Sequence, residues 1–150
     1  DSILCRIRHQ RLAIAQVHED GEAFQYLGSA LLNYNAIHDA VACFQRATLL
    51  TSNDARVYNN LGIASSQMMD FEKAESAYKR GIEILEAAES AGCNVASDLN
   101  QIRLNFGLDL ANRDDFARAV DILTPSAQQE PTSRTIFDAQ RLWQFCRDEL

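Results

Sequence analysis

The chain has few residues that interrupt helices, with two prolines and six glycines among 150 residues. This scarcity favours long helices over a sheet-rich fold, which needs many turns. No apolar run approaches the roughly 20 residues that a transmembrane helix requires, and no signal peptide is visible. We therefore expect a soluble, helical chain with no membrane insertion by this segment.

Basic residues are outnumbered by acidic ones, 14 against 21, which gives a formal net charge of −7. Proteins that bind nucleic acids need a basic surface to neutralise phosphates, so we expect no nucleic-acid partner. An acidic excess suits a basic protein partner or serves solubility, and both interpretations stay open. The hydrophobic share of 47% is enough to build a buried core.

Patterns that carry catalysis or bind metals are missing. None of the four cysteines lies in a CxxC pair, and no histidine stands at metal-ligand spacing from one. No GxSxG, HExxH or P-loop pattern occurs. The acidic pairs at Glu19 and Asp114 fall at helix ends or turns, where carboxylates cap helices more often than they transfer protons. We predict no enzymatic activity, no metal and no cofactor. The cysteines, read as buried apolar residues or idle thiols, are Cys5, Cys43, Cys93 and Cys146.

An offset of 34 residues relates two parts of the sequence and aligns Leu27-Gly28 with Leu61-Gly62. A third copy, at Phe106-Gly107, begins eleven residues late. Each copy continues with a small residue, a large apolar or aromatic residue and a second small residue at the same distances. The matched residues are Phe24 and Tyr58; Ala40, Ala74 and Ala119; Phe44, Tyr78 and Leu123; and Ala47, Gly81 and Ser126.

This pattern resembles the signature of the tetratricopeptide-repeat (TPR) family. The resemblance implies an all-α fold, a right-handed α-α superhelix (TPR solenoid) of three repeats with flanking N- and C-terminal helices. Each repeat would be an antiparallel helix pair that is stable only against its neighbours. Glycine is unfavourable inside a helix, so Gly28, Gly62 and Gly107 are expected where the partner helix approaches closely. The small residues expected opposite these glycines are Ala40, Ala74 and Ala119.

The resemblance divides the chain, as one TPR domain over residues 1–150, into five parts. These are an N-terminal helix (1–20), repeat one (21–54), repeat two with an extended helix (55–99), repeat three (100–133) and a C-terminal capping helix (134–150). The expected helices are Ser2–Val17, Glu22–Tyr34, Ile37–Leu50, Ala55–Met68, Phe71–Ser90, Ser97–Asn112, Phe116–Leu123 and Ser133–Arg147.

Several local features refine these boundaries. Asn35 is expected in a left-handed turn, and Asp54, in the loop that begins at Ser52, can cap the following helix. Ser97 is expected to cap its helix in the same way. Pro125 should end or kink the helix in which it falls, because proline lacks a backbone donor and clashes one turn back.

The two end helices depart from the repeat pattern. The first carries a basic side that is either a docking patch for an acidic partner or a solvated face: Arg6, Arg8, His9 and Arg11. The last carries an apolar stripe: Ile136, Phe137, Leu142, Trp143 and Cys146. Its expected water-facing residues are Asp138, Arg141, Gln144 and Arg147.

In TPR proteins the first helix of each repeat lines a concave groove that receives a peptide. Asn60 and Asn105 fall at one equivalent position of that helix, and amides can donate and accept hydrogen bonds to an extended backbone. The alternative is that they are exposed polar residues without a binding role. The basic clamp by which some TPR proteins hold a carboxylate is not expected, because Gln25 stands at one of its positions. The predicted groove residues are Gln25, Tyr26, Ser29, Asn33, Arg56, Asn60, Ile63, Gln67, Asn105, Leu108 and Asn112, beside Glu22, Asn59, Gln101 and Leu104.

The leading functional hypothesis is a non-enzymatic scaffold or adaptor that binds a peptide or helix of a protein partner in the groove. A second is an assembly accessory protein, because Asn100–Asn105 loosely resembles the TPR lipoproteins of bacterial tight-adherence pilus assembly. A third is a homo-oligomer formed through the end helices. The sequence begins with Asp1 and not with methionine, so we expect that a segment precedes it. A targeting signal, if the protein has one, would lie in that segment. The second hypothesis implies a periplasmic domain that is tethered through its N-terminus. A cytoplasmic location stays open as the alternative.

Overall fold

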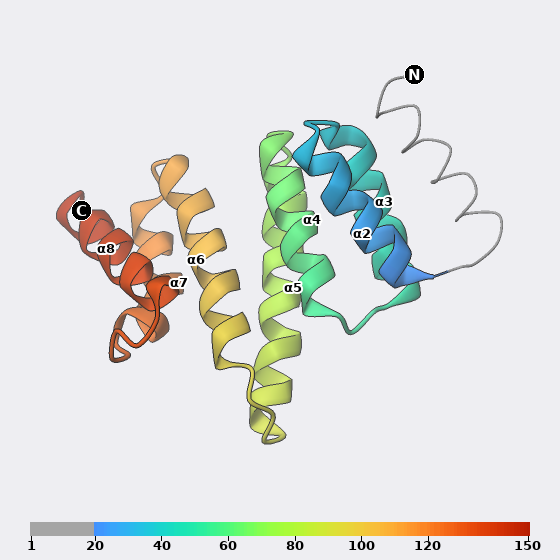
Figure 1. The fold of residues 1–150 in the computed structure, drawn as a ribbon. Coiled ribbons are helices and arrows are strands. Elements are labelled where there is room, and N and C mark those ends of the chain that lie inside the picture. Colours follow the sequence, from blue (N-terminus) through green and yellow to red (C-terminus); the bar gives the residue numbers. More distant parts are fainter. Residues whose placement is uncertain (1–19) are drawn as a thin grey trace. The chain divides into compact units, whose positions relative to one another are not determined.

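The computed structural model describes residues 20–150, which form helices joined by short loops with no strand among them (Figure 1). The predicted all-α fold class is confirmed. The helix expected at Ser2–Val17, with its basic side, lies outside the described residues. The helices are α2 (Gly21–Asn33), α3 (Ile37–Leu50), α4 (Ala55–Gln67), α5 (Phe71–Ser90), α6 (Ala96–Asn112), α7 (Phe116–Ala127) and α8 (Arg134–Asp148).

The described helices belong to two compact units, divided within α5 between Ala77 and Tyr78. The first unit holds α2, α3, α4 and the first turns of α5. The second holds the remainder of α5 with α6, α7 and α8. α5 ends at Ser90, as predicted, and α6 begins at Ala96, earlier relative to Gly107 than α2 and α4 begin relative to their glycines. The eleven extra residues therefore lengthen α5, the loop after it and the start of α6.

The turn inside each repeat has the same backbone conformation. Seven residues after each repeat glycine stands a residue with positive φ: 58° at Asn35, 61° at Met69 and 59° at Asp114. The left-handed conformation predicted for Asn35 is confirmed. Methionine adopts it rarely, so its presence at Met69 shows that the turn geometry is imposed by the helix pair and not by local preference. Three copies of one turn support three copies of one repeat.

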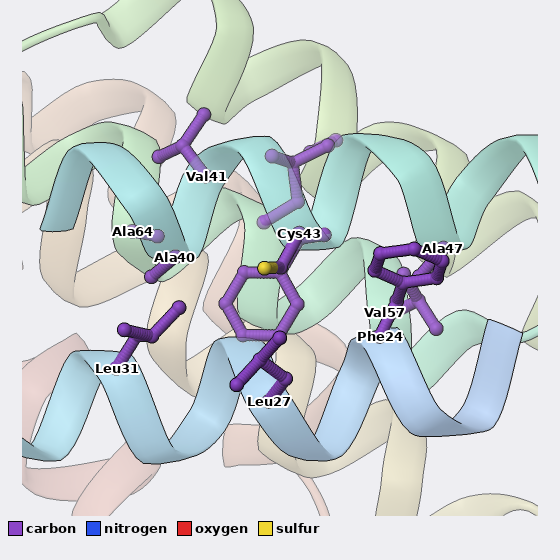
Figure 2. Close-up of a cluster of buried hydrophobic side chains, with 12 residues drawn as sticks. Phe24, Leu27, Leu31, Ala40, Val41, Cys43, Ala47, Val57 and Ala64 are labelled. Carbon is purple, nitrogen blue, oxygen red and sulfur yellow. The ribbon is translucent and has the colours of Figure 1, made fainter. Parts of the chain in front are cut away.

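The core of the first unit lies between α2, α3 and α4. Figure 2 shows Leu27 and Leu31 of α2 pointing toward α3, where Ala40 and Cys43 are buried. Phe44 is fully buried in the same cluster. Burial of a leucine or phenylalanine side chain stabilises a fold by about 1.5–3 kcal/mol, so this cluster holds the helices together.

The residue that closely faces Gly28, and the one that faces Gly107, is large. A Cβ atom at Gly28 would lie 2.7 Å from Cε1 of Phe44, and one at Gly107 would lie 2.6 Å from Cγ of Leu123. The small residues expected opposite them, such as Ala40, are buried but are not these nearest neighbours. Each of these two glycines makes room for the ring or branched side chain that the partner helix places against it.

The core of the second unit contains an aromatic stack. The rings of Tyr78 on α5 and Phe106 on α6 lie 5.2 Å apart and nearly parallel. Burial raises the pKa of the Tyr78 hydroxyl, with a further contribution from the negative charge of Asp109. At the surface, Arg103 of α6 donates to Glu86 of α5 over 3.1 Å. These contacts fix α6 against α5.

Ser97 does not cap α6. The helix begins at Ala96, after Val95, and its first backbone bond runs from Leu99 N to the Val95 oxygen over 2.9 Å. Ser97 therefore lies within the first turn, and the predicted cap was wrong. By contrast, Asp54 does cap α4, since its side chain accepts from the backbone N–H of Arg56 over 3.0 Å.

Pro125 lies inside α7, which continues to Ala127, so the predicted end at Leu123 was wrong. Hydrogen bonds from outside the helix backbone hold the turn around the proline. Ser126 donates to Asn100 Oδ1 of α6 over 2.7 Å, and Gln129 Nε2 donates to the Pro125 oxygen over 3.1 Å. These side-chain hydrogen bonds, one of them to α6, thus offset the helix-breaking tendency of proline.

We expect Pro125→Ala to raise the free energy of unfolding by about 1 kcal/mol, because alanine restores a backbone donor without a ring that clashes one turn back. Thermal denaturation followed by circular dichroism measures this. A fall in melting temperature would show instead that α7 requires the restricted backbone of proline at this position.

α8 packs one face against α6 and α7. Ile136, Ala139 and Cys146 are buried, and the indole N–H of Trp143 donates to Thr124 Oγ1 over 3.0 Å. Phe137, predicted to belong to the apolar stripe, is 50% exposed. The stripe is therefore narrower than predicted.

Candidate functional site

The solvent-facing side of α2 carries the first set of predicted groove residues. α2 begins at Gly21 because the Asp20 side chain accepts from the backbone N–H of Glu22 over 3.0 Å. Tyr26, one turn further on, is 68% exposed. Asn33 is exposed and Ser29 is half-buried, whereas Gln25 is only 9% exposed and offers a partner little surface.

α4 presents the equivalent side in the same unit and contacts α2. Asn60 and Ile63 are half-buried there, and Gln67 at the end of the helix is exposed. A half-buried side chain is held by its neighbours while part of it stays open to a ligand. The face of α2 and α4, here called the α2/α4 face, comprises Glu22, Tyr26, Ser29, Asn33, Arg56, Asn60, Ile63 and Gln67.

Arg56 is the electrostatic centre of the α2/α4 face. Its guanidinium donates to Asp54 through Nη2 over 2.8 Å and Nε over 3.1 Å. Hydrogen bonding and charge attraction from Asp54 raise the pKa of Arg56, and Glu22 and Tyr26 of α2 are close enough to raise it further. Burial pushes the pKa of Asp54 upward, but the Arg56 hydrogen bonds outweigh it and the pKa is lowered. Asp54 thus holds the Arg56 guanidinium in one position at the start of α4.

An open pocket adjoins this cluster, with a volume of about 580 Å³. Sequence reasoning missed it, although Asp20 and Asp54, which cap the two helices at the 34-residue offset, were a usable signal. Every side chain that lines it carries a polar or charged group, beside apolar atoms of the same residues. Its lining residues are Asp20, Glu22, Thr51, Ser52, Asn53, Asp54 and Arg56.

The remaining predicted groove residues lie on α6, in the second unit. Leu108 is 46% exposed and Asn112 is exposed. Asn105 Oδ1 accepts from Gln101 Nε2 over 3.2 Å, and Gln101 Oε1 accepts from Thr135 Oγ1 of α8 over 3.4 Å. The Asn105 amide therefore already takes part in a polar chain between α6 and α8.

Within residues 20–150, no group of His, Cys, Asp and Glu side chains is arranged to hold a metal ion. Cys43 and Cys146 are buried thiols outside any disulfide, and Cys93 is an exposed one. Burial raises the pKa of the Cys146 thiol, with a smaller contribution from Glu149, so it is a poor nucleophile. None of the described helices combines the length and apolar character needed to cross a bilayer.

No model of a protein family matches the sequence, and no curated protein matches it. Among solved structures, the chain is similar to the crystal structure of YrrB, described as a TPR protein with an unusual peptide-binding site. The two share 17% sequence identity over 92% of this chain and 84% of that chain, with a TM-score of 0.43. Because that TM-score is low, the evidence for tetratricopeptide-like repeats is the chain's own: repeated glycines, repeated turns and the helix pairs between them.

Proposed function

We propose that this protein is a non-enzymatic interaction scaffold that binds an extended peptide of a partner protein on the α2/α4 face. The observation that carries the proposal is the exposed ring of Tyr26 on the same face as Arg56, whose guanidinium is held in place by Asp54. Tyrosine and arginine are the side chains most enriched in the energetic centres of interfaces, because each combines a large contact area with directional hydrogen bonding.

The surrounding residues fit an extended peptide better than a small molecule. Asn60 and Gln67 carry amides, which donate and accept hydrogen bonds and so match both groups of a peptide backbone. Ile63 supplies an apolar contact between them. All of these residues lie on helices, which hold binding groups more firmly than loops do and so reduce the entropy lost on binding.

α6 carries a smaller face of the same kind, formed by Asn105, Leu108 and Asn112. We propose it as a second contact surface for a partner. The role in pilus assembly and the periplasmic location stay predictions, because no described residue bears on them.

The proposal is tested with peptides selected from a random phage-displayed library on the immobilised protein. For a selected peptide labelled with a fluorophore, anisotropy titration gives Kd. We expect Tyr26→Ala to weaken binding about tenfold or more, and Asn60→Ala to weaken it severalfold, because truncating an interface anchor removes contact area and hydrogen bonds.

Leu49→Ala serves as the matched control, since Leu49 lies on α3 of the same unit and is 74% exposed, close to the 68% of Tyr26. It should leave Kd unchanged, and circular dichroism should show that all three variants melt as the parent does. If the selected peptides bind the Tyr26 and Asn60 variants as tightly as they bind the parent protein, the binding surface lies elsewhere and the proposal is refuted.

A further inference from the structure

α8 has a second face that is largely open to solvent, with one ring contact to Phe116 at the start of α7. Its residues recur at intervals of three and four along the helix, so they share one side. All of them are exposed, whereas the opposite side buries Ile136, Ala139 and Cys146 against the unit. This surface, the outer α8 face, comprises Arg134, Phe137, Arg141, Gln144, Phe145 and Asp148.

Two half-exposed phenylalanines form the apolar part of the outer α8 face. Phe137 and Phe145 are 50% and 51% exposed. Phe145 meets the Phe116 ring edge-on at 6.0 Å, and the Arg141 guanidinium lies 5.9 Å from the centre of the Phe137 ring. Neighbours thus fix both rings in place while leaving half of each open, as at residues that dock into a partner.

The order of residues on this face is nearly the same read in either direction. Phe137 and Phe145 each lie four residues from Arg141, and Arg134 and Asp148 each lie seven residues from it. Reversing the direction of the helix therefore puts Phe145 where Phe137 was, and puts the negative Asp148 where the positive Arg134 was. A second α8, laid antiparallel, would place Phe137 against Phe145 and Arg134 against Asp148, and each pair would form twice.

We propose that the outer α8 face binds the same face of a second copy of this chain, as an antiparallel, two-fold symmetric pair. The charge complementarity of the two ends favours a second copy, because an isologous contact needs a surface that complements itself. Arg134 is available for it, with 94% of its side chain exposed despite a 3.6 Å contact to Asp138. This inference is independent of the α2/α4 face.

Association is expected to be weak. The two copies of Arg141 meet at the symmetry axis and repel each other, and one helix face buries little area. We expect a dissociation constant on the order of 100 µM, the range of small, transient interfaces.

Charge reversal tests the pairing, with sedimentation equilibrium of the full chain over concentrations that bracket this value. Arg134→Glu alone should weaken dimerisation roughly tenfold, because the reversed contact occurs twice in the pair. Asp148→Arg alone should do the same. The double variant Arg134→Glu/Asp148→Arg should restore the dimer to within about threefold of the parent, since the charges are again opposite.

These changes should not harm folding, because an acid at the start of α8 and a base at its end suit the helix dipole. Equal melting temperatures would verify this. Arg80→Glu, at an exposed position of α5, is the control and should leave dimerisation unchanged. The proposal is overturned if the parent chain stays monomeric or if its dimer is unchanged by the single charge reversals. It is also overturned if the double variant does not recover dimerisation, or if Arg80→Glu weakens the dimer as much as Arg134→Glu does.

Discussion

Gly28→Ala is expected to lower the free energy of unfolding by about 2–3 kcal/mol, although alanine is the better helix former. Helix propensity alone predicts a gain of about 1 kcal/mol, so the two effects have opposite signs. Packing outweighs propensity because the new Cβ would lie 2.7–2.9 Å from three atoms of the Phe44 ring. That ring is fully buried and cannot move aside without displacing the core of the first unit.

Urea denaturation measures this loss, and a double-mutant cycle with Phe44→Ala assigns its cause. Without the ring, Gly28→Ala should be neutral or stabilising, because its methyl group then fills part of the vacated space. A Gly28→Ala variant more stable than the parent would contradict the close approach of Phe44 to α2.

Asn100→Leu is expected to lower the free energy of unfolding by about 2–4 kcal/mol. Asn100 is buried on α6, where its Oδ1 accepts from Ser126 over 2.7 Å and from Gln129 over 3.1 Å, and its Nδ2 donates to Gln129 over 3.0 Å. Leucine cannot make these bonds. The Ser126 hydroxyl, which has 0% exposure, would then be left in the interior without the partner that now accepts its hydrogen bond.

The matched control is Asn112→Leu, at an exposed position of the same helix, which should change stability by less than about 0.5 kcal/mol. In a Ser126→Ala background the further loss from Asn100→Leu should be smaller, because the buried hydroxyl is gone. An Asn100→Leu variant as stable as the parent would show that this network contributes nothing to the fold.

Much of the helix pattern could be predicted from the sequence because the 34-residue offset fixes the register of each pair. The bounds of α3 and α5 agree with the predicted ranges, and the left-handed turn at Asn35 follows from the tolerance of asparagine for that conformation. Repeats make such predictions robust, since an error in one copy would disagree with the others.

The errors arose where contacts between helices outweighed local preference. Pro125 is a local signal for a helix end. However, Ser126 and Gln129 form hydrogen bonds with Asn100, which lies on α6, and no local pattern in the sequence reveals these bonds. Periodicity alone places Phe137 in the apolar stripe of the last helix, although its ring is half-exposed. Which side of α8 faces α6 and α7 depends on how the helices cross, and the sequence does not specify that.

The candidate site was predicted less well than the fold. Tyr26, Asn33 and Arg56, which the register places in the groove, are exposed, because the register separates the core side of a helix from its solvent side. It could not indicate that Gln25, at the edge of that side, is buried. Nor could it show the pocket beside Arg56, which depends on the loop between α3 and α4.

The central claim is that a partner peptide lies on the α2/α4 face, and site-specific photocrosslinking tests it most directly. Tyr26 is replaced by the photoreactive residue benzoylphenylalanine, which keeps an aromatic ring, and Leu49 on α3 is replaced likewise for comparison. After irradiation with a selected peptide, the account predicts a crosslinked product at position 26 and little at position 49. Equal crosslinking at both positions, or crosslinking at position 49 alone, would contradict it.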